Sequence, residues 1–186
     1  GRAFDVRPAG MLALDVARIE AGLLLIDVDF HSSKKALIES QRYSPFEMGL
    51  SRLVSLGKHR FVGQSALCEE ARRGPDREIV GLEVDWTEIE SLYEAIGLAP
   101  QIPATASRAA VPVYRGEAQT GKATSTTWSP ILKKLIALAT VRREDAALGT
   151  PLSIEVTVEA VRHRVTARVV KTPFFNPARK TATPPW

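Results

Sequence analysis

The chain has 186 residues, of which 45% are hydrophobic and 25% are charged, and its formal net charge is +4. These values are typical of one globular domain or two small ones, and they exclude a disordered, collagen-like or disulfide-stapled protein. Residues 171–186 hold three basic residues and no acidic one, which leaves 22 basic and 21 acidic residues in the rest of the chain. A body this close to neutral has no broad phosphate-binding face, so we expect no nucleic-acid partner.

Two further features of the composition bear on the compartment. No apolar run approaches the roughly 18 residues that span a bilayer, so we expect no membrane partner. The single cysteine, Cys68, excludes an internal disulfide and a paired-cysteine metal site. The composition therefore predicts a cytoplasmic protein.

Apolar residues at helical spacing predict a helix over residues 9–20. Gly22 follows this helix, and a glycine with positive φ is a common helix stop. Glu20 is the last residue of the helix. Judged on the residues alone, its carboxylate is either a solvated charge facing the negative end of the helix or a ligand-binding group.

Three further elements are predicted before residue 75. Residues 31–35 are polar and typical of a loop, and residues 50–56 are expected to form a strand. Residues 65–73 predict a helix that ends at Gly74. We expect Cys68, within this helix, to be a small buried residue.

A strand is predicted over residues 79–84. Residues 87–90 then match the S/T-x-x-E capping box, with Thr87 as the N-cap, and predict a short helix that runs to Gly97.

Alternating polar and apolar residues dominate the second half of the chain. They predict strands over residues 152–158 and 165–169, joined by a turn near 160–163, and residues 135–141 form a more apolar strand. Several short strands separated by turn residues predict a small barrel or sandwich.

Most tests for catalytic motifs fail. Residues 116–123 fit GxxxxGK, but Ala123 stands where a P-loop needs Ser or Thr, so a tight turn between two strands is expected there. The three histidines, His31, His59 and His163, share no metal-ligand spacing and are expected on the surface or in loops. No GxSxG segment is present. We therefore predict no metal site and no serine nucleophile.

Six segments resemble, in the same order, motifs of the folate-dependent aminomethyltransferases, the glycine cleavage T-protein superfamily. Residues 13–23 are similar to ARDxLRLEAGL, 44–50 to TPxEAGL, 60–67 to DFIGREAL, 121–130 to GEVTSGTFSP, 134–141 to KPIALAYV and 167–174 to ARVVKLPF. Each motif alone is a weak signal, but six in the correct order over nearly the whole chain are a strong one.

The resemblance implies an α+β fold. Residues 1–74 would be the C-terminal part of a folate-binding core domain, residues 77–172 a C-terminal antiparallel β-barrel, and residues 173–186 a basic tail. The family's catalytic aspartate resides in an N-terminal half that this chain does not contain, so no catalytic residue is assigned.

The resemblance also implies a folate site. Glu20 matches the glutamate that holds the pterin ring of tetrahydrofolate, and its two carboxylate oxygens can accept from adjacent pterin N–H donors. Arg60, with Lys58 beside it, is the candidate to meet the folate carboxylates, the alternative being a solvated loop cation.

The implied activity is transfer of a methylene or methyl group to tetrahydrofolate. The partner would be a small-molecule one-carbon donor or a lipoyl carrier protein. Two alternatives remain open within the same fold. One is a tetrahydrofolate-dependent demethylase or the folate module of a sarcosine- or dimethylglycine-oxidising enzyme, and the other is a non-catalytic folate-binding regulator.

Overall fold

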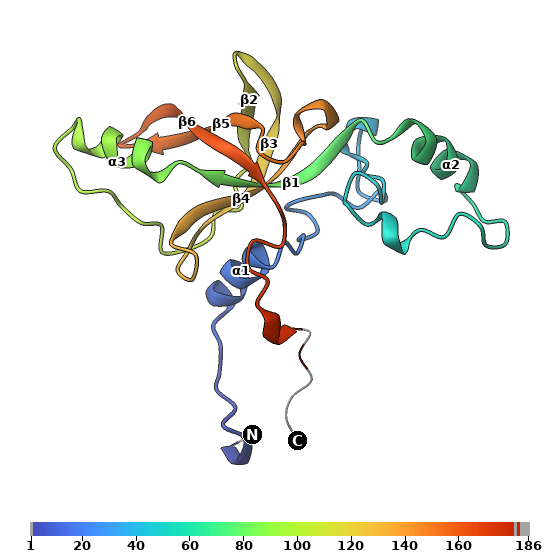
Figure 1. Cartoon of the computed structure of the whole chain (residues 1–186), viewed down its shortest axis with the longest axis horizontal. Helices are drawn as coiled ribbons and strands as arrows, with labels where there is room; N and C mark the ends of the chain where they lie inside the picture. The colour runs from blue at the N-terminus through green and yellow to red at the C-terminus, as the bar shows by residue number, and fades with distance from the viewer. Residues whose placement is uncertain (1, 181, 183–186) are drawn as a thin grey trace.

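Six antiparallel strands close into a barrel at the centre of the molecule (Figure 1). The structure is a computed structural model that describes residues 2–180 and 182. Around the barrel the strands follow the order β1-β4-β3-β2-β5-β6, and β1 pairs with β6 to close it. The strands are β1 (Arg77–Val84), β2 (Val111–Arg115), β3 (Ala118–Ser129), β4 (Lys134–Arg142), β5 (Pro151–Val158) and β6 (Val161–Val170). The predicted antiparallel barrel is confirmed.

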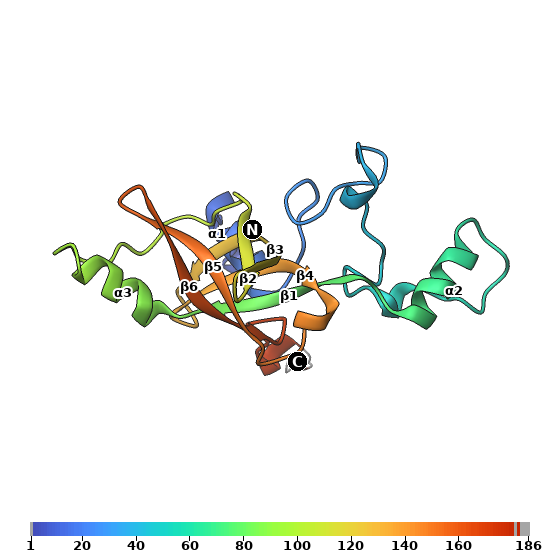
Figure 2. The same cartoon turned by 90° about the horizontal axis from the view of Figure 1, so that it is seen from above.

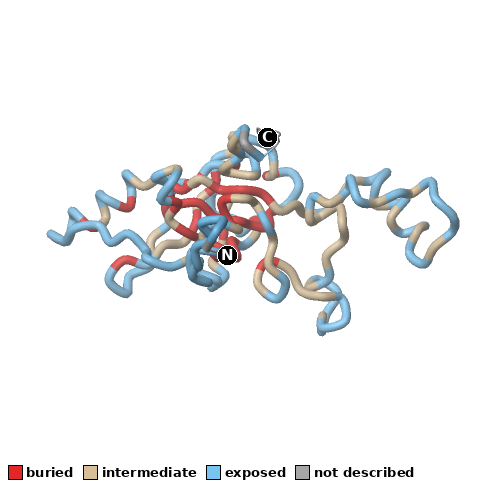
Figure 3. Tube along the Cα trace, turned by 90° about the horizontal axis from the view of Figure 1, so that it is seen from below, coloured by how far each residue is buried: buried red, intermediate tan, exposed pale blue. Residues whose placement is uncertain are grey.

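The barrel interior is the main hydrophobic core, as the burial colours of Figure 3 show. It is filled by the apolar members of the alternating segments, because successive side chains of a strand point to opposite faces. On β5 and β6 these are Leu152, Ile154, Val158, Val165, Ala167 and Val169. Helix α3 (Trp86–Glu94) packs against β6 and adds Ile89 and Tyr93 to the same core.

A second, smaller apolar cluster lies on the outer face of the barrel. Helix α1 (Met11–Glu20) lies against β3 and β4, and its Ile19 packs with Ile136 and Leu138 of β4. The helix ends at Glu20, as predicted, and Gly22 follows its C-cap with φ +66°. This packing places the C-terminal end of α1 beside the barrel wall.

Helix α2 (Gln64–Arg73) lies at one end of the molecule, away from α1 (Figures 1 and 2). It buries none of its residues, and the predicted burial of Cys68 is therefore wrong, because that side chain is exposed. The segment before α2 is tied to the barrel by Arg77 of β1. The Arg77 guanidinium lies 4.0 Å from the centre of the Tyr43 ring, and its Nε donates to Glu47 Oε1 (2.8 Å).

The strand predicted over residues 50–56 is absent. A short 3₁₀ helix, η3 (Ser51–Leu53), occupies its centre. The N–H groups of Leu53 and Val54 donate to carbonyls three residues earlier, at 2.9 and 3.0 Å, so they are not available to a neighbouring strand. Four other short 3₁₀ helices occur in the described chain, namely η1 (Arg2–Phe4), η2 (Glu39–Gln41), η4 (Arg143–Asp145) and η5 (Ala178–Lys180).

Two turn predictions can be compared with the structure. The turn within the GxxxxGK segment lies at Gly116, which has φ +58°, between β2 and β3, and β3 then continues through Lys122 without a helix. The β5–β6 turn is formed by Glu159 and Ala160, so β6 already begins within the segment predicted as the turn. Neither segment has the strand-to-helix geometry of a phosphate-binding loop.

Residues 173–186, predicted as a basic tail, lie partly outside the described residues. None of the helices in the described part of the chain is long and apolar enough to span a membrane.

The cap of α3 differs from the predicted capping box. The helix begins at Trp86, and its N-cap is Asp85, whose Oδ1 accepts from the Thr87 N–H (2.9 Å). Glu90, the predicted capping-box partner, instead accepts from Trp86 Nε1 (2.8 Å). An aspartate two residues before the threonine satisfies a free N–H of the first helical turn.

We predict that Asp85→Ala lowers the free energy of unfolding by about 1 kcal/mol, the usual cost of losing an N-cap. Thr87→Ala should have little effect, because Thr87 contributes only its main-chain N–H to this cap. Urea unfolding of both variants and the wild type measures the difference. A larger loss of unfolding free energy in Thr87→Ala than in Asp85→Ala would show that Thr87, and not Asp85, caps the helix.

Candidate functional site

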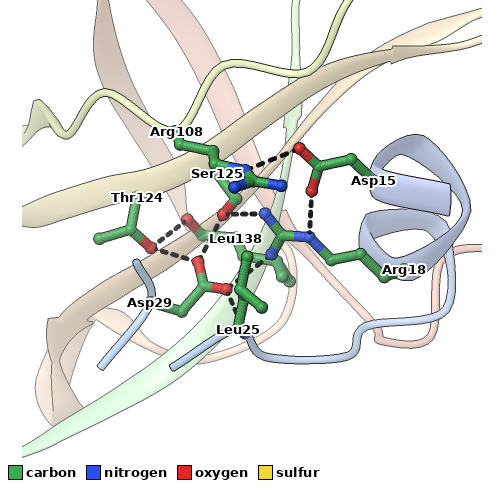
Figure 4. Close-up of polar contacts among 8 residues, drawn as sticks. All are labelled: Asp15, Arg18, Leu25, Asp29, Arg108, Thr124, Ser125 and Leu138. Atoms are coloured by element: carbon green, nitrogen blue, oxygen red, sulfur yellow. Dashed lines mark hydrogen bonds and ion pairs between the residues drawn. The ribbon is translucent and has the colours of Figure 1, made fainter. Parts of the chain in front are cut away.

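A buried carboxylate, Asp29, connects the chain after α1 to the barrel (Figure 4). Its Oδ2 atom accepts from Arg18 Nη1 (2.6 Å) and from the Leu25 N–H (2.8 Å). Its Oδ1 atom accepts from Thr124 Oγ1 (2.7 Å) and Ser125 Oγ (2.6 Å). Four donors, one of them a guanidinium, compensate for the water that the carboxylate loses at 1% exposure.

Arg18 extends this network along α1. Its Nη2 donates to Ser125 Oγ (2.8 Å) and its Nε donates to Asp15 Oδ1 (2.8 Å). The second Asp15 oxygen accepts from Arg108 Nε (2.9 Å). The charges therefore alternate in sign from Arg108 to Asp29, which allows two carboxylates and a guanidinium to be buried together.

The local backbone explains how Asp29 reaches the barrel. A tight turn follows α1, in which Asp27 has φ +65° and its N–H donates to the Phe30 carbonyl (2.7 Å). On the barrel side, the β3–β4 register shifts between Ala123 and Ser125, which marks a β-bulge at Thr124. Neighbouring residues of a regular strand point to opposite faces, but a bulge lets both Thr124 and Ser125 turn their hydroxyls towards Asp29.

Glu20 ends α1 and is buried, at 5% exposure. Its Oε1 accepts from Ser129 Oγ (2.6 Å), and its main-chain carbonyl accepts from the Phe175 N–H (2.9 Å). Among the described residues nothing donates to Oε2. Every fully buried side-chain nitrogen or oxygen in that part of the chain has a partner, so Oε2 is not completely buried. The carboxylate is therefore held at one oxygen and open at the other, in the sense that no donor from the described residues occupies it.

Known proteins share both the barrel and the segment that carries Glu20. Residues 93–176 match the family model of the glycine cleavage T-protein C-terminal barrel domain. The aminomethyltransferase of Thermosynechococcus vestitus is 35% identical over 181 residues, which cover 97% of this chain and 41% of that protein. The aminomethyltransferase of Pseudothermotoga lettingae is 31% identical over 182 residues, which cover 98% and 41%. The chain belongs to the aminomethyltransferase, or glycine cleavage T-protein, superfamily.

A solved member of this superfamily has the same fold. The glycine cleavage system aminomethyltransferase T from Bartonella henselae superposes with a TM-score of 0.65 at 23% identity, over 88% of this chain and 38% of that one. The present chain spans about two fifths of the length of the curated relatives, and it corresponds to the C-terminal portion of a T-protein-like protein. The predicted family and its α+β fold with a C-terminal barrel are confirmed.

The three residues predicted for the folate site do not lie together. Glu20 is the last residue of α1, and its side chain contacts Ser129 of the barrel, whereas Lys58 and Arg60 belong to the segment that precedes α2. Figures 1 and 2 show α2 and this segment at one end of the molecule, away from α1. Both cations are exposed, and Lys58 Nζ lies 4.7 Å from the centre of the Phe61 ring. The structure thus joins Glu20 to the barrel and leaves the two cations apart from it.

The sequence did not identify Asp29 as part of the site. It stands in an irregular segment without a motif, and its partners Thr124 and Ser125 are about 95 residues away along the chain. Only the resemblance of residues 121–130 to GEVTSGTFSP marks that stretch of β3. No group of three or more histidine, cysteine, aspartate or glutamate residues in the described chain is placed to hold a metal ion.

We predict that Asp29→Asn lowers the free energy of unfolding by about 3–5 kcal/mol, because it leaves Arg18 buried with one carboxylate fewer. The matched control is Asp27→Asn in the same turn. Asp27 is half-exposed and pairs with the exposed Lys35, and asparagine tolerates a positive φ, so little change is expected there. Urea unfolding measures both variants, and equal losses would contradict the central role of Asp29.

The acidity of Asp15 gives a second prediction for this site. Burial raises the pKa of Asp15, but hydrogen bonds and charge from Arg18 and Arg108 outweigh it and hold the pKa below its ordinary value. The ion pairs therefore contribute stability above the ordinary aspartate pKa of about 3.9, and this contribution is lost as the pH falls through the lowered value.

Asp15→Asn should accordingly be less stable than the wild type at pH 7. The gap between the two should narrow as the pH falls below about 4, because protonation removes the same charge from the wild type. Melting temperatures measured from pH 7 to pH 3 test this. A gap that stays constant over the whole range would show that the ionised Asp15 carboxylate adds no stability.

Proposed function

We propose that the protein binds tetrahydrofolate and takes part in moving a one-carbon unit, as a methylene or methyl group, from a donor to it. The proposal rests on membership of the superfamily and on one observation, the buried Glu20 carboxylate with one fixed and one open oxygen. Curated relatives of the chain bear the name aminomethyltransferase. A role in one-carbon transfer is therefore the function that the chain supports best.

The chemistry of Glu20 suits a pterin. A reduced pterin ring presents adjacent N–H donors, and an ionised carboxylate accepts from two parallel donors in one plane. In this arrangement the chain's own part is to bind and orient the ring. The open Oε2 atom would accept from one ring N–H. The Ser129 hydroxyl occupies only one lone pair of Oε1, so the second lone pair of Oε1 would accept from the other ring N–H. When bound, tetrahydrofolate would supply the nitrogen atoms that take up the one-carbon unit.

Other parts of the proposed function depend on residues beyond this site. The donor would be a small molecule or a lipoyl carrier protein, and Arg60 with Lys58 would meet the folate carboxylates. A cytoplasmic location also remains a prediction. Because the chain spans about two fifths of its relatives' length, acid–base catalysis is assigned to none of its residues.

Glu20→Ala tests the folate site directly. It should weaken tetrahydrofolate binding by the full-length protein by about 1.5–3 kcal/mol, or tenfold or more, because it removes a charge-assisted pair. Isothermal titration calorimetry at pH 7 measures the affinity. The matched control is Glu94→Ala, since Glu94 is likewise the last residue of its helix, α3, but is exposed.

The outcomes separate the candidate functions. Binding in which Glu20→Ala matches the wild type would remove Glu20 from the site. Tight binding without transfer from any one-carbon donor would favour the non-catalytic folate-binding regulator. Transfer from N-methylated amines would favour the demethylase or oxidase-module alternative.

A further inference from the structure

We infer that Ser129 is a positioning residue that fixes the plane of the Glu20 carboxylate for a ligand with adjacent N–H donors. The inference rests on the proposed function and assigns a specific role to a barrel residue within it. Ser129 is the last residue of β3 and is fully buried, with 0% exposure. Its contribution comes from the barrel, whereas Glu20 comes from α1.

The Ser129 hydroxyl has a defined orientation. Its Oγ accepts a hydrogen bond from the Leu132 N–H (3.0 Å). A hydroxyl has a single proton, and the only acceptor that Ser129 Oγ meets in the described chain is Glu20 Oε1, at 2.6 Å. The Leu132 N–H therefore fixes the oxygen, and the proton points at the carboxylate.

Both sides of this contact are held by main-chain hydrogen bonds. The β3–β4 hairpin closes tightly after Ser129, where the Lys133 N–H donates to the Ser129 carbonyl (2.7 Å) and Lys133 has φ +55°. On the other side, the Phe175 N–H holds the Glu20 carbonyl. A hydroxyl on a rigid hairpin thus meets a carboxylate at a clamped helix end, and rigid elements position a site better than loops do.

The consequence is a pre-organised acceptor. A glutamate side chain has several rotatable bonds, and ordering such a side chain on binding costs affinity. The Ser129 hydrogen bond orders Glu20 before any ligand arrives and occupies only one of the lone pairs of its carboxylate. Loss of this hydroxyl should therefore weaken binding of tetrahydrofolate about three- to tenfold through Glu20 alone.

A double-mutant cycle on the full-length protein tests the inference. Tetrahydrofolate affinity and melting temperature are measured for the wild type, Ser129→Ala, Glu20→Ala and the double variant. We expect Ser129→Ala to weaken binding three- to tenfold in the wild-type background and to have no further effect once Glu20 is alanine. The melting temperatures should show the same coupling. Either single substitution removes the hydrogen bond between Ser129 and Glu20, so the second substitution cannot remove it again.

Ser125→Ala is the matched control. Ser125 is another fully buried serine of β3, but its hydroxyl donates to Asp29 and not to Glu20. Its effects on affinity and melting temperature should add to those of Glu20→Ala without coupling. A comparable coupling for Ser125→Ala would show that the cycle detects a general loosening of β3, and this would overturn the specific role of Ser129.

The remaining outcomes separate this inference from the proposed function. Folate binding that depends on Glu20 but is unchanged in Ser129→Ala, or is weakened equally in both backgrounds, overturns the role of Ser129 and leaves the proposed function intact. The wild type could also fail to bind tetrahydrofolate while the melting temperatures of the Ser129 and Glu20 variants are still coupled. That result would confirm the hydrogen bond and refute both the folate function and the positioning role.

Discussion

The ion pair between Arg18 and Asp29 is the interaction on which the arrangement of the site depends. Asp29 has almost no contact with water, and its charge is acceptable only because a guanidinium and three other donors converge on it. Those donors come from α1, from the turn after α1 and from β3. If any of these segments moved away, a buried charge would lose its partner, so the network fixes their relative positions.

Three consecutive residues at the end of α1 use this fixed position in different ways. Arg18 enters the polar network, Ile19 packs in the outer apolar cluster with Ile136 and Leu138, and Glu20 meets Ser129. Successive side chains of a helix point about 100° apart, so they normally face different surroundings. Three in a row can all contact the barrel only because the end of α1 lies close against it. The stop at Gly22 therefore matters, because a continued helix would carry the chain away from the turn that presents Asp29.

The sequence predicted the elements whose signals are local. Alternation in residues 152–158 and 165–169 marked half-buried strands, helical spacing marked α1, and the stop at Gly74 marked the end of α2. It failed where the outcome depended on distant partners or competing local bonds. Residues 51–53 form a 3₁₀ helix whose i to i+3 hydrogen bonds take up the N–H groups that a strand would have needed. Asp85 caps α3 in place of Thr87, because its carboxylate accepts from the Thr87 N–H. Asp29 had no local signal, since its hydroxyl partners lie on a bulge of β3.

The resemblance to known motifs singled out Glu20, Lys58 and Arg60, and the structure places these three residues in different surroundings. Glu20 is held by the barrel and the C-terminal segment. In the motif DFIGREAL the arginine stands where this chain has Gln64, the first residue of α2, whose amide donates to the Leu56 carbonyl (2.8 Å) in the loop before the helix. Any positive charge for the folate carboxylates would therefore come from neighbours such as Arg60, an exposed residue of the loop that precedes α2. The pterin end of the proposed site is thus built into the barrel contact, whereas its anionic end depends on an element that the barrel does not fix.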